Sequence, residues 1–93
     1  MPIAILFDSS TGTQEHYDLM NDKLKEIGQE EPAGRISHIA GPTESGGWRM
    51  VEVWESKEAW EVYVGEYFTR VLHESSIPDP EVSIWQVHKM FHL

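Results

Sequence analysis

Hydrophobic positions near the start of the chain follow first a strand pattern and then a helix pattern. Residues 3–7 form a short apolar run bounded by the polar residues 8–12, which is typical of a buried strand. Thr11 or Thr13 then supplies an N-cap, and Gly28 a stop, for a helix. Apolar residues recur at helical spacing between these signals: Tyr17, Met20, Leu24 and Ile27.

The middle of the chain predicts a hairpin of residues 35–40 and 48–54 around a turn at 41–47. Successive side chains of a strand point to opposite faces, so the second strand has two different faces. One face carries the aliphatic Val51 and Val53 together with Arg49, and we expect it to pack against helices. The other face is aromatic and acidic, with the members Trp48, Met50, Glu52 and Trp54.

A second helix is predicted from Ser56, its N-cap, to about Glu74, with Gly65 tolerated inside it. Its wide apolar face consists of Ala59, Trp60, Tyr63, Val64, Tyr67, Phe68, Val71 and Leu72. Two prolines within residues 77–80 then break the chain. Residues 82–87 read as a last strand, followed by a tail at 88–93.

The resulting order is β-α-β-β-α-β, which predicts an α+β ferredoxin-like fold. Right-handed crossovers turn this order into a four-stranded antiparallel sheet with both helices on one face. A chain of 93 residues makes one domain, residues 1–93. We expect Trp48, Met50 and Trp54 on the uncovered sheet face, where a second copy would cover them in a homodimer.

Charge and composition exclude several classes of partner. The net charge of −9 disfavours binding to nucleic acid and to anionic membrane surfaces. No apolar run of about 18 residues and no leader pattern occurs, so we expect neither a membrane span nor a secretory leader. The absence of cysteine excludes disulfides and thiolate chemistry and fits a cytoplasmic location.

Several strings of the chain, in their order, resemble the small dimeric α/β-barrel proteins related to the antibiotic-biosynthesis monooxygenases. They are His38-Ile39-Ala40-Gly41-Pro42, Gly47-Trp48, Val51-Glu52-Val53-Trp54-Glu55-Ser56, an aromatic helix and Val87-His88. The resemblance implies a homodimer whose two sheets form a barrel, with a pocket between sheet and helices. It does not select a reaction, because one fold hosts many activities.

Members of this family include oxygenases that use no cofactor and act on oxygen-sensitive phenols. The resemblance therefore implies a small aromatic ligand, no cofactor and a possible oxygenase activity. Pockets of such enzymes need aromatic walls and a hydrogen-bonding Asn, His or Tyr. This chain supplies aromatics and His38, but its only asparagine is Asn21, on the first helix.

His38 is the candidate catalytic residue, because an imidazole titrates close enough to neutrality to act as a general base. The alternative is a strand histidine with a purely structural role. Glu52 lies in the middle of a strand, where a buried carboxylate needs a partner. It is expected either to orient a histidine or to form an interface salt bridge with Arg35 or Arg49, and the salt bridge is slightly favoured.

The remaining candidates for ligand contact are Trp54, Trp48, Met50, Tyr67 and His88. Aromatic residues of this kind are more often core or interface anchors than ligand walls. His88 and His92 are four residues apart but follow a strand, so no metal site is predicted. His16 and His73 are expected to face solvent or helix ends.

Two other functions remain open from the sequence. Pro2 at the head of the first strand resembles the catalytic amine of the N-terminal-proline tautomerases, although the central hairpin argues against their repeated β-α-β unit. The other alternative is a structural or regulatory dimer whose barrel is filled by its own side chains. An open pocket with convergent polar groups would favour ligand binding instead.

Overall fold

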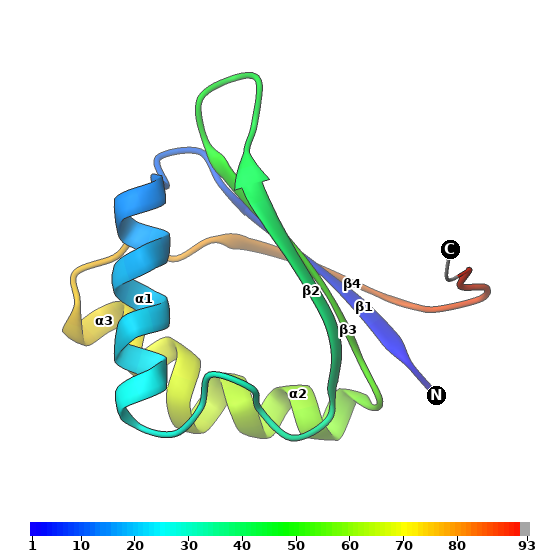
Figure 1. The fold of residues 1–93 in the computed structure, drawn as a ribbon. Coiled ribbons are helices and arrows are strands. Elements are labelled where there is room, and N and C mark those ends of the chain that lie inside the picture. Colours follow the sequence, from blue (N-terminus) through cyan, green and yellow to red (C-terminus); the bar gives the residue numbers. More distant parts are fainter. Residues whose placement is uncertain (92–93) are drawn as a thin grey trace.

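One antiparallel sheet, covered on one face by helices, makes up the fold (Figure 1). The computed structural model describes residues 1–91. The four strands are β1 (Ile3–Ser9), β2 (Arg35–Pro42), β3 (Trp48–Trp54) and β4 (Glu81–Gln86). Their order in the sheet is β2-β3-β1-β4, and all neighbours are antiparallel. The predicted α+β ferredoxin-like fold is confirmed.

The first helix, α1 (Gln14–Glu26), begins and ends where the sequence signals predict. The Thr13 hydroxyl accepts a hydrogen bond from the backbone N–H of His16 at 3.1 Å, which satisfies one of the free donors of the first turn. Met20 and Leu24, four residues apart, are the buried residues of this helix. Gly28 follows the end of the helix with φ +75°, a conformation that glycine adopts without steric cost.

The second helical segment is interrupted in its middle. It consists of α2 (Lys57–Tyr63), the π-helical turn η1 (Val64–Phe68) and α3 (Thr69–Glu74). A π turn accommodates an extra residue, so Tyr63 and Phe68, five positions apart, both face the core. The predicted extent of the helix is confirmed, while its π turn was not foreseen.

The assignment of the two faces of β3 from the sequence was wrong. Trp54 is 0% exposed and Met50 is 7% exposed, because both face the helices. Val51 and Val53 lie on the uncovered face instead. The helices cover the face with the largest side chains, since these remove the most apolar surface from water.

The uncovered face of the sheet is therefore aliphatic and partly exposed. Ile39 on β2 lies opposite Val51 and is 68% exposed, and Trp85 on β4 is 48% exposed. On the same face Arg49 forms an ion pair with Asp8 at 2.7 Å, not with Glu52. This face, defined here by Ile39, Val51, Val53 and Trp85, is called the open face below.

Candidate functional site

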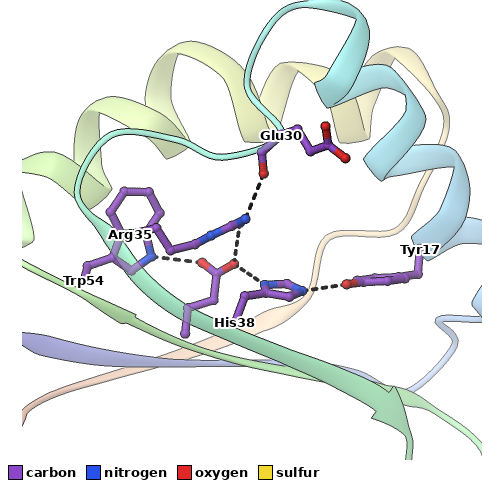
Figure 2. Close-up of polar contacts among 6 residues, drawn as sticks. Tyr17, Glu30, Arg35, His38 and Trp54 are labelled. Atoms are coloured by element: carbon purple, nitrogen blue, oxygen red, sulfur yellow. Dashed lines mark hydrogen bonds and ion pairs between the residues drawn. The ribbon is translucent and has the colours of Figure 1, made fainter.

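The carboxylate of Glu52 is the centre of a polar cluster between the sheet and the helices. Glu52 is 3% exposed and lies in the middle of β3, opposite Ile5 on β1 and His38 on β2. A buried charge is costly unless hydrogen-bonded and paired. Three side chains supply these partners, as Figure 2 shows: Arg35, His38 and Trp54.

His38 shares one carboxylate oxygen of Glu52 with Arg35. Its Nδ1 lies 2.6 Å from Oε2, and Arg35 Nη1 donates to the same oxygen at 3.2 Å. The indole Nε1 of Trp54 donates to the other oxygen, Oε1, at 2.9 Å. Glu52 thus orients a histidine and also forms a salt bridge with Arg35. This salt bridge lies within one subunit and not at an interface as expected.

A local irregularity of β2 brings Arg35 and His38 to the same face of the sheet. In a regular strand, residues three apart point to opposite faces. The register shifts between Arg35 and Ser37, so that Arg35 lies opposite Trp54 and Ser37 opposite Val53. The extra residue, Ile36, is left 46% exposed. Arg35 is also fixed from the loop before β2, because its Nη2 donates to the Glu30 carbonyl at 2.8 Å (Figure 2).

Tyr17 on α1 completes the cluster from the helical side. Its hydroxyl lies 2.6 Å from His38 Nε2 (Figure 2), and the two ring planes are nearly parallel, at 17°, with centroids 5.8 Å apart. The phenol ring also contacts Trp48, at a centroid distance of 5.2 Å. The sequence pattern placed Tyr17 only on the apolar face of the helix. Its role was missed because helical spacing says nothing about which strand residue a hydroxyl meets.

The hydrogen bonds define the direction in which a proton can move. An ionised carboxylate only accepts, so His38 Nδ1–H donates to Glu52. In the neutral imidazole Nε2 is then the acceptor, and the Tyr17 hydroxyl donates to it. Tyr17, His38 and Glu52 follow one another as hydroxyl, imidazole and carboxylate. This order is also found in hydrolase triads, where the imidazole takes the hydroxyl proton and the carboxylate holds the imidazole in place.

Tyr63 on α2 lies near the cluster but cannot serve as a second base. Burial, and to a lesser degree the negative charge of Glu52, raise the pKa of Tyr63 far above its ordinary value, with Arg35 opposing the shift. Its ring packs against Trp54 at a centroid distance of 5.2 Å. The hydroxyl of Tyr63 therefore stays protonated under physiological conditions.

A narrow apolar cavity adjoins the cluster at Tyr17. It has a volume of about 40 Å³ and lies between α1, β3, the η1–α3 segment and the chain at 77–80. Trp48 and Met50, both proposed from the sequence as ligand contacts, line it together with Tyr17. A volume of this size holds only a few water-sized groups, so one end of a small molecule fits without rearrangement.

The other predicted site residues lie elsewhere. Trp54 is fully buried and reaches the cluster only through its hydrogen bond to Glu52. Tyr67 packs against the hydrophobic core and does not line the cavity. His88 is exposed beyond β4, at the opposite edge of the sheet from β2. His92 falls outside the described residues. The structure therefore brings His38 and Glu52 together, but not with Tyr67 or His88.

Within residues 1–91, no group of three or more His, Asp or Glu side chains is placed to hold a metal ion. No helix of this part of the chain is both long enough and apolar enough to cross a membrane.

No family model and no curated protein matches this sequence. Solved structures do match it over nearly its whole length. SnoaB, a cofactor-independent oxygenase from Streptomyces nogalater, superposes with a TM-score of 0.65 at 10% identity, covering 96% of this chain and 93% of that one. A candidate antibiotic biosynthesis monooxygenase from Deinococcus radiodurans gives 0.63 at 16% identity, covering 100% and 98%.

A third match is a dimeric ferredoxin-like protein of unknown function from Jannaschia sp. CCS1, with a TM-score of 0.64 at 14% identity, covering 94% and 100%. At these identities the similarity concerns the fold and not the activity. The resemblance inferred from the strings of the sequence is confirmed at that level: this chain has the ferredoxin-like fold of the antibiotic-biosynthesis-monooxygenase-like proteins.

Proposed function

We propose that this protein is a homodimer that binds a small aromatic molecule between sheet and helices and removes a proton from it, as a cofactor-independent oxygenase would. The observation that carries the proposal is the chain of short hydrogen bonds from Tyr17 through His38 to Glu52. Burying a carboxylate is costly unless it is paired and hydrogen-bonded, and a buried cluster of titratable groups beside an apolar cavity is a candidate functional site.

The proposed proton transfer follows the hydrogen bonds of the cluster, from Tyr17 to His38, with Glu52 behind the histidine. A phenolic substrate beside Tyr17 passes its proton to the Tyr17 oxygen as the Tyr17 proton moves to His38 Nε2. Glu52 stabilises the resulting imidazolium, as a carboxylate does in a hydrolase triad. Arg35 Nη1 donates to the same carboxylate and helps to hold it beside the histidine.

The subsequent oxidation needs only the substrate and dioxygen. A phenolate is electron-rich enough to transfer an electron to dioxygen. At an activated ring methylene the balance is CH₂ + O₂ → C=O + H₂O: two C–H bonds and the O–O bond break, carbon is oxidised and both oxygen atoms are reduced. No separate reductant is required, which fits a site built from an imidazole, a phenol and aromatic walls.

The dimer is supported by the open face. Ile39 and Trp85 are large apolar residues exposed on a sheet whose other face is already covered. Exposed apolar patches commonly mark interfaces, and a self-complementary patch favours a two-fold dimer. A structural neighbour of the same fold is described as dimeric. A second copy of this chain is the proposed occupant of the open face.

The test is oxygen uptake with 1,8-dihydroxyanthrone, a phenol with an activated ring methylene. We expect the wild-type protein to accelerate uptake, and Tyr17→Phe and His38→Gln to lower kcat by roughly 10²–10⁴-fold, the usual contribution of a general base. His73→Gln is the matched control, because the side chain of His73 is exposed and, among the described residues, hydrogen-bonds to Asp79. Equal rates for wild type and His38→Gln would refute the catalytic proposal and favour a structural or regulatory dimer.

No observation favours the tautomerase alternative. Pro2 is exposed at the start of β1, whereas the cavity adjoins the other end of that strand at Ser9. The sheet is also antiparallel throughout, unlike a repeated parallel β-α-β unit.

A further inference from the structure

The hydroxyl of Tyr17 is hydrogen-bonded to a base, and a carboxylate holds that base in place. The hydroxyl lies 2.6 Å from His38 Nε2, and His38 Nδ1 lies 2.6 Å from Glu52 Oε2 (Figure 2). A phenol that loses an electron becomes a strong acid, so its oxidation is easiest when the proton leaves with the electron. A base already within hydrogen-bond distance takes this proton without rearrangement. The surroundings of Tyr17 therefore favour its oxidation by one electron.

The other two tyrosines of the chain, Tyr63 and Tyr67, have different surroundings. Among the described residues, the hydroxyl of Tyr17 is hydrogen-bonded to a histidine, and neither of the other two hydroxyls has such a base. Burial raises the pKa of Tyr63 far above its ordinary value, which opposes the loss of its proton. Tyr67 packs against the hydrophobic core. Tyr17 is thus the tyrosine that is equipped to release an electron and a proton together.

The indole of Trp48 lies against the phenol ring of Tyr17, with centroids 5.2 Å apart. Its Nε1 is buried from solvent and has no hydrogen-bond partner in the described part of the chain. An oxidised Trp48 would therefore keep its positive charge beside the hydrophobic core, which is costly. We expect an electron vacancy on Trp48 to pass to Tyr17, where proton transfer to His38 leaves a neutral phenoxyl group.

We infer that Tyr17 is a redox-active residue that reduces an uncharged organic peroxyl radical by one electron, while His38 takes its proton. The balance is ROO• + Tyr17–OH + His38 → ROO⁻ + Tyr17–O• + His38–H⁺. The O–H bond of Tyr17 breaks, the electron goes to the peroxyl oxygen, and the proton goes to Nε2. Proton exchange through solvent then gives the hydroperoxide ROOH and neutral His38. The inference uses the same hydrogen bonds as the proposed function but does not depend on the oxygenase chemistry.

The cavity beside Tyr17 determines the class of oxidant. None of the described residues that line it is Lys, Arg, Asp or Glu, so a charged oxidant would lose its hydration there without a partner. The net charge of −9 also repels anionic oxidants such as superoxide. A volume of about 40 Å³ admits the terminal oxygen atoms of a radical but not the whole of a larger molecule. These properties fit the O–O end of an uncharged peroxyl radical.

Photo-oxidation of the whole chain, without any substrate, tests whether Tyr17 is redox-active. A ruthenium–bipyridine complex oxidised by light and persulfate removes one electron, and electron paramagnetic resonance and optical absorption detect the tyrosyl radical. We expect this radical in the wild type and a loss of most of the signal in Tyr17→Phe. His38→Gln should slow its formation by roughly 10²-fold or more, the usual contribution of a proton acceptor. Tyr67→Phe is the matched control and should leave both yield and rate unchanged.

The test does not depend on the folding of one variant. If Tyr17→Phe does not fold, the double variant Tyr63→Phe/Tyr67→Phe, in which Tyr17 is the only tyrosine, should give the wild-type signal. Three results would overturn the inference: a radical that stays on tryptophan, equal yields in wild type and Tyr17→Phe, or equal rates in wild type and His38→Gln.

The peroxyl step is tested with radicals formed in air from an uncharged azo initiator, in competition with an oxidisable dye. We expect the wild-type protein to delay bleaching of the dye and Tyr17→Phe to lose most of this delay. Equal delays would refute the peroxyl step. Failure of the oxygenase proposal looks different, because a protein that forms the Tyr17 radical but shows no oxygen uptake with 1,8-dihydroxyanthrone keeps the redox-active tyrosine and loses the oxygenase function.

Discussion

His38 Nδ1 lies 2.6 Å from Oε2 of Glu52, although the two residues are 14 positions apart on neighbouring strands. The contact is possible because the antiparallel register places them opposite each other, with both side chains toward the helices. It fixes the orientation of the imidazole and leaves Nε2 for Tyr17.

The first prediction concerns the stability conferred by Glu52. Glu52→Ala should lower the free energy of unfolding by about 3–5 kcal/mol, because it leaves the Arg35 charge and the Trp54 indole N–H without their partner. Urea denaturation measures the change. Glu61→Ala, an exposed residue of α2, should stay within about 0.5 kcal/mol of wild type. A loss of the same small size for both variants would mean that the cluster does not stabilise the fold.

The second prediction concerns the tautomer of His38. In the neutral form of the imidazole we expect the proton on Nδ1, since Glu52 can only accept. Long-range ¹H–¹⁵N correlation spectra distinguish the two ring nitrogens. Tyr17→Phe removes the donor to Nε2 and should move the Nε2 resonance while leaving the tautomer unchanged. A proton found on Nε2 would contradict the proposed direction of proton transfer.

The third prediction compares two glycines with positive φ. Gly34 has φ +94°, and a Cβ built there would lie 2.8 Å from the Cβ of Ala59; Gly28 has φ +75° and open space around it. Gly28→Ala should cost about 1–2 kcal/mol for the left-handed conformation alone. Gly34→Ala adds overpacking and should cost about 1–3 kcal/mol more. Thermal unfolding of both variants measures the difference. Equal losses of stability would show that the chain at Gly34, just before β2, is not tightly packed against α2.

The fourth prediction concerns alkaline pH and Tyr63. Its pKa in the folded protein is raised above the ordinary value of 10.0, chiefly by burial. Above about pH 10 the unfolded chain releases this proton while the folded protein keeps it, so stability falls as pH rises, by at most about 1.4 kcal/mol per pH unit. Tyr63→Phe should show a smaller loss between pH 9 and about pH 11 in urea denaturation. An identical loss of stability in the wild-type protein and in Tyr63→Phe would mean that other titratable groups cause the pH dependence.

The fifth prediction concerns the open face. Ile39→Lys puts a charge on the proposed interface and removes an apolar contact worth about 1.5–3 kcal/mol for each subunit. We expect sedimentation to show a dimer for wild type and a shift toward monomer for the variant. Val62→Lys is the control, because Val62 is 55% exposed on α2, away from the open face. A wild-type monomer at micromolar concentration would refute the dimer.

The site was partly accessible from the sequence. His38 and Glu52 stood out because a histidine and a carboxylate in the middle of strands each need a partner. Tyr17 did not, since its spacing on the helix already explained it as a core residue. His16 was expected to face solvent or a helix end, and it lies in the first turn of α1, with its Nδ1 buried.

The sequence by itself determined the order of elements, the hairpin, the helix caps and hence the ferredoxin-like fold, because periodicity, turn residues and capping act over a few neighbouring positions. Only the tertiary structure decided which face of β3 the helices cover, since alternation defines two faces but not the one that is buried. It also decided that the irregularity after Arg35 turns that residue toward Glu52. Tyr17 meets His38 across 21 positions for the same reason: such contacts depend on how whole elements pack, and no local pattern encodes them.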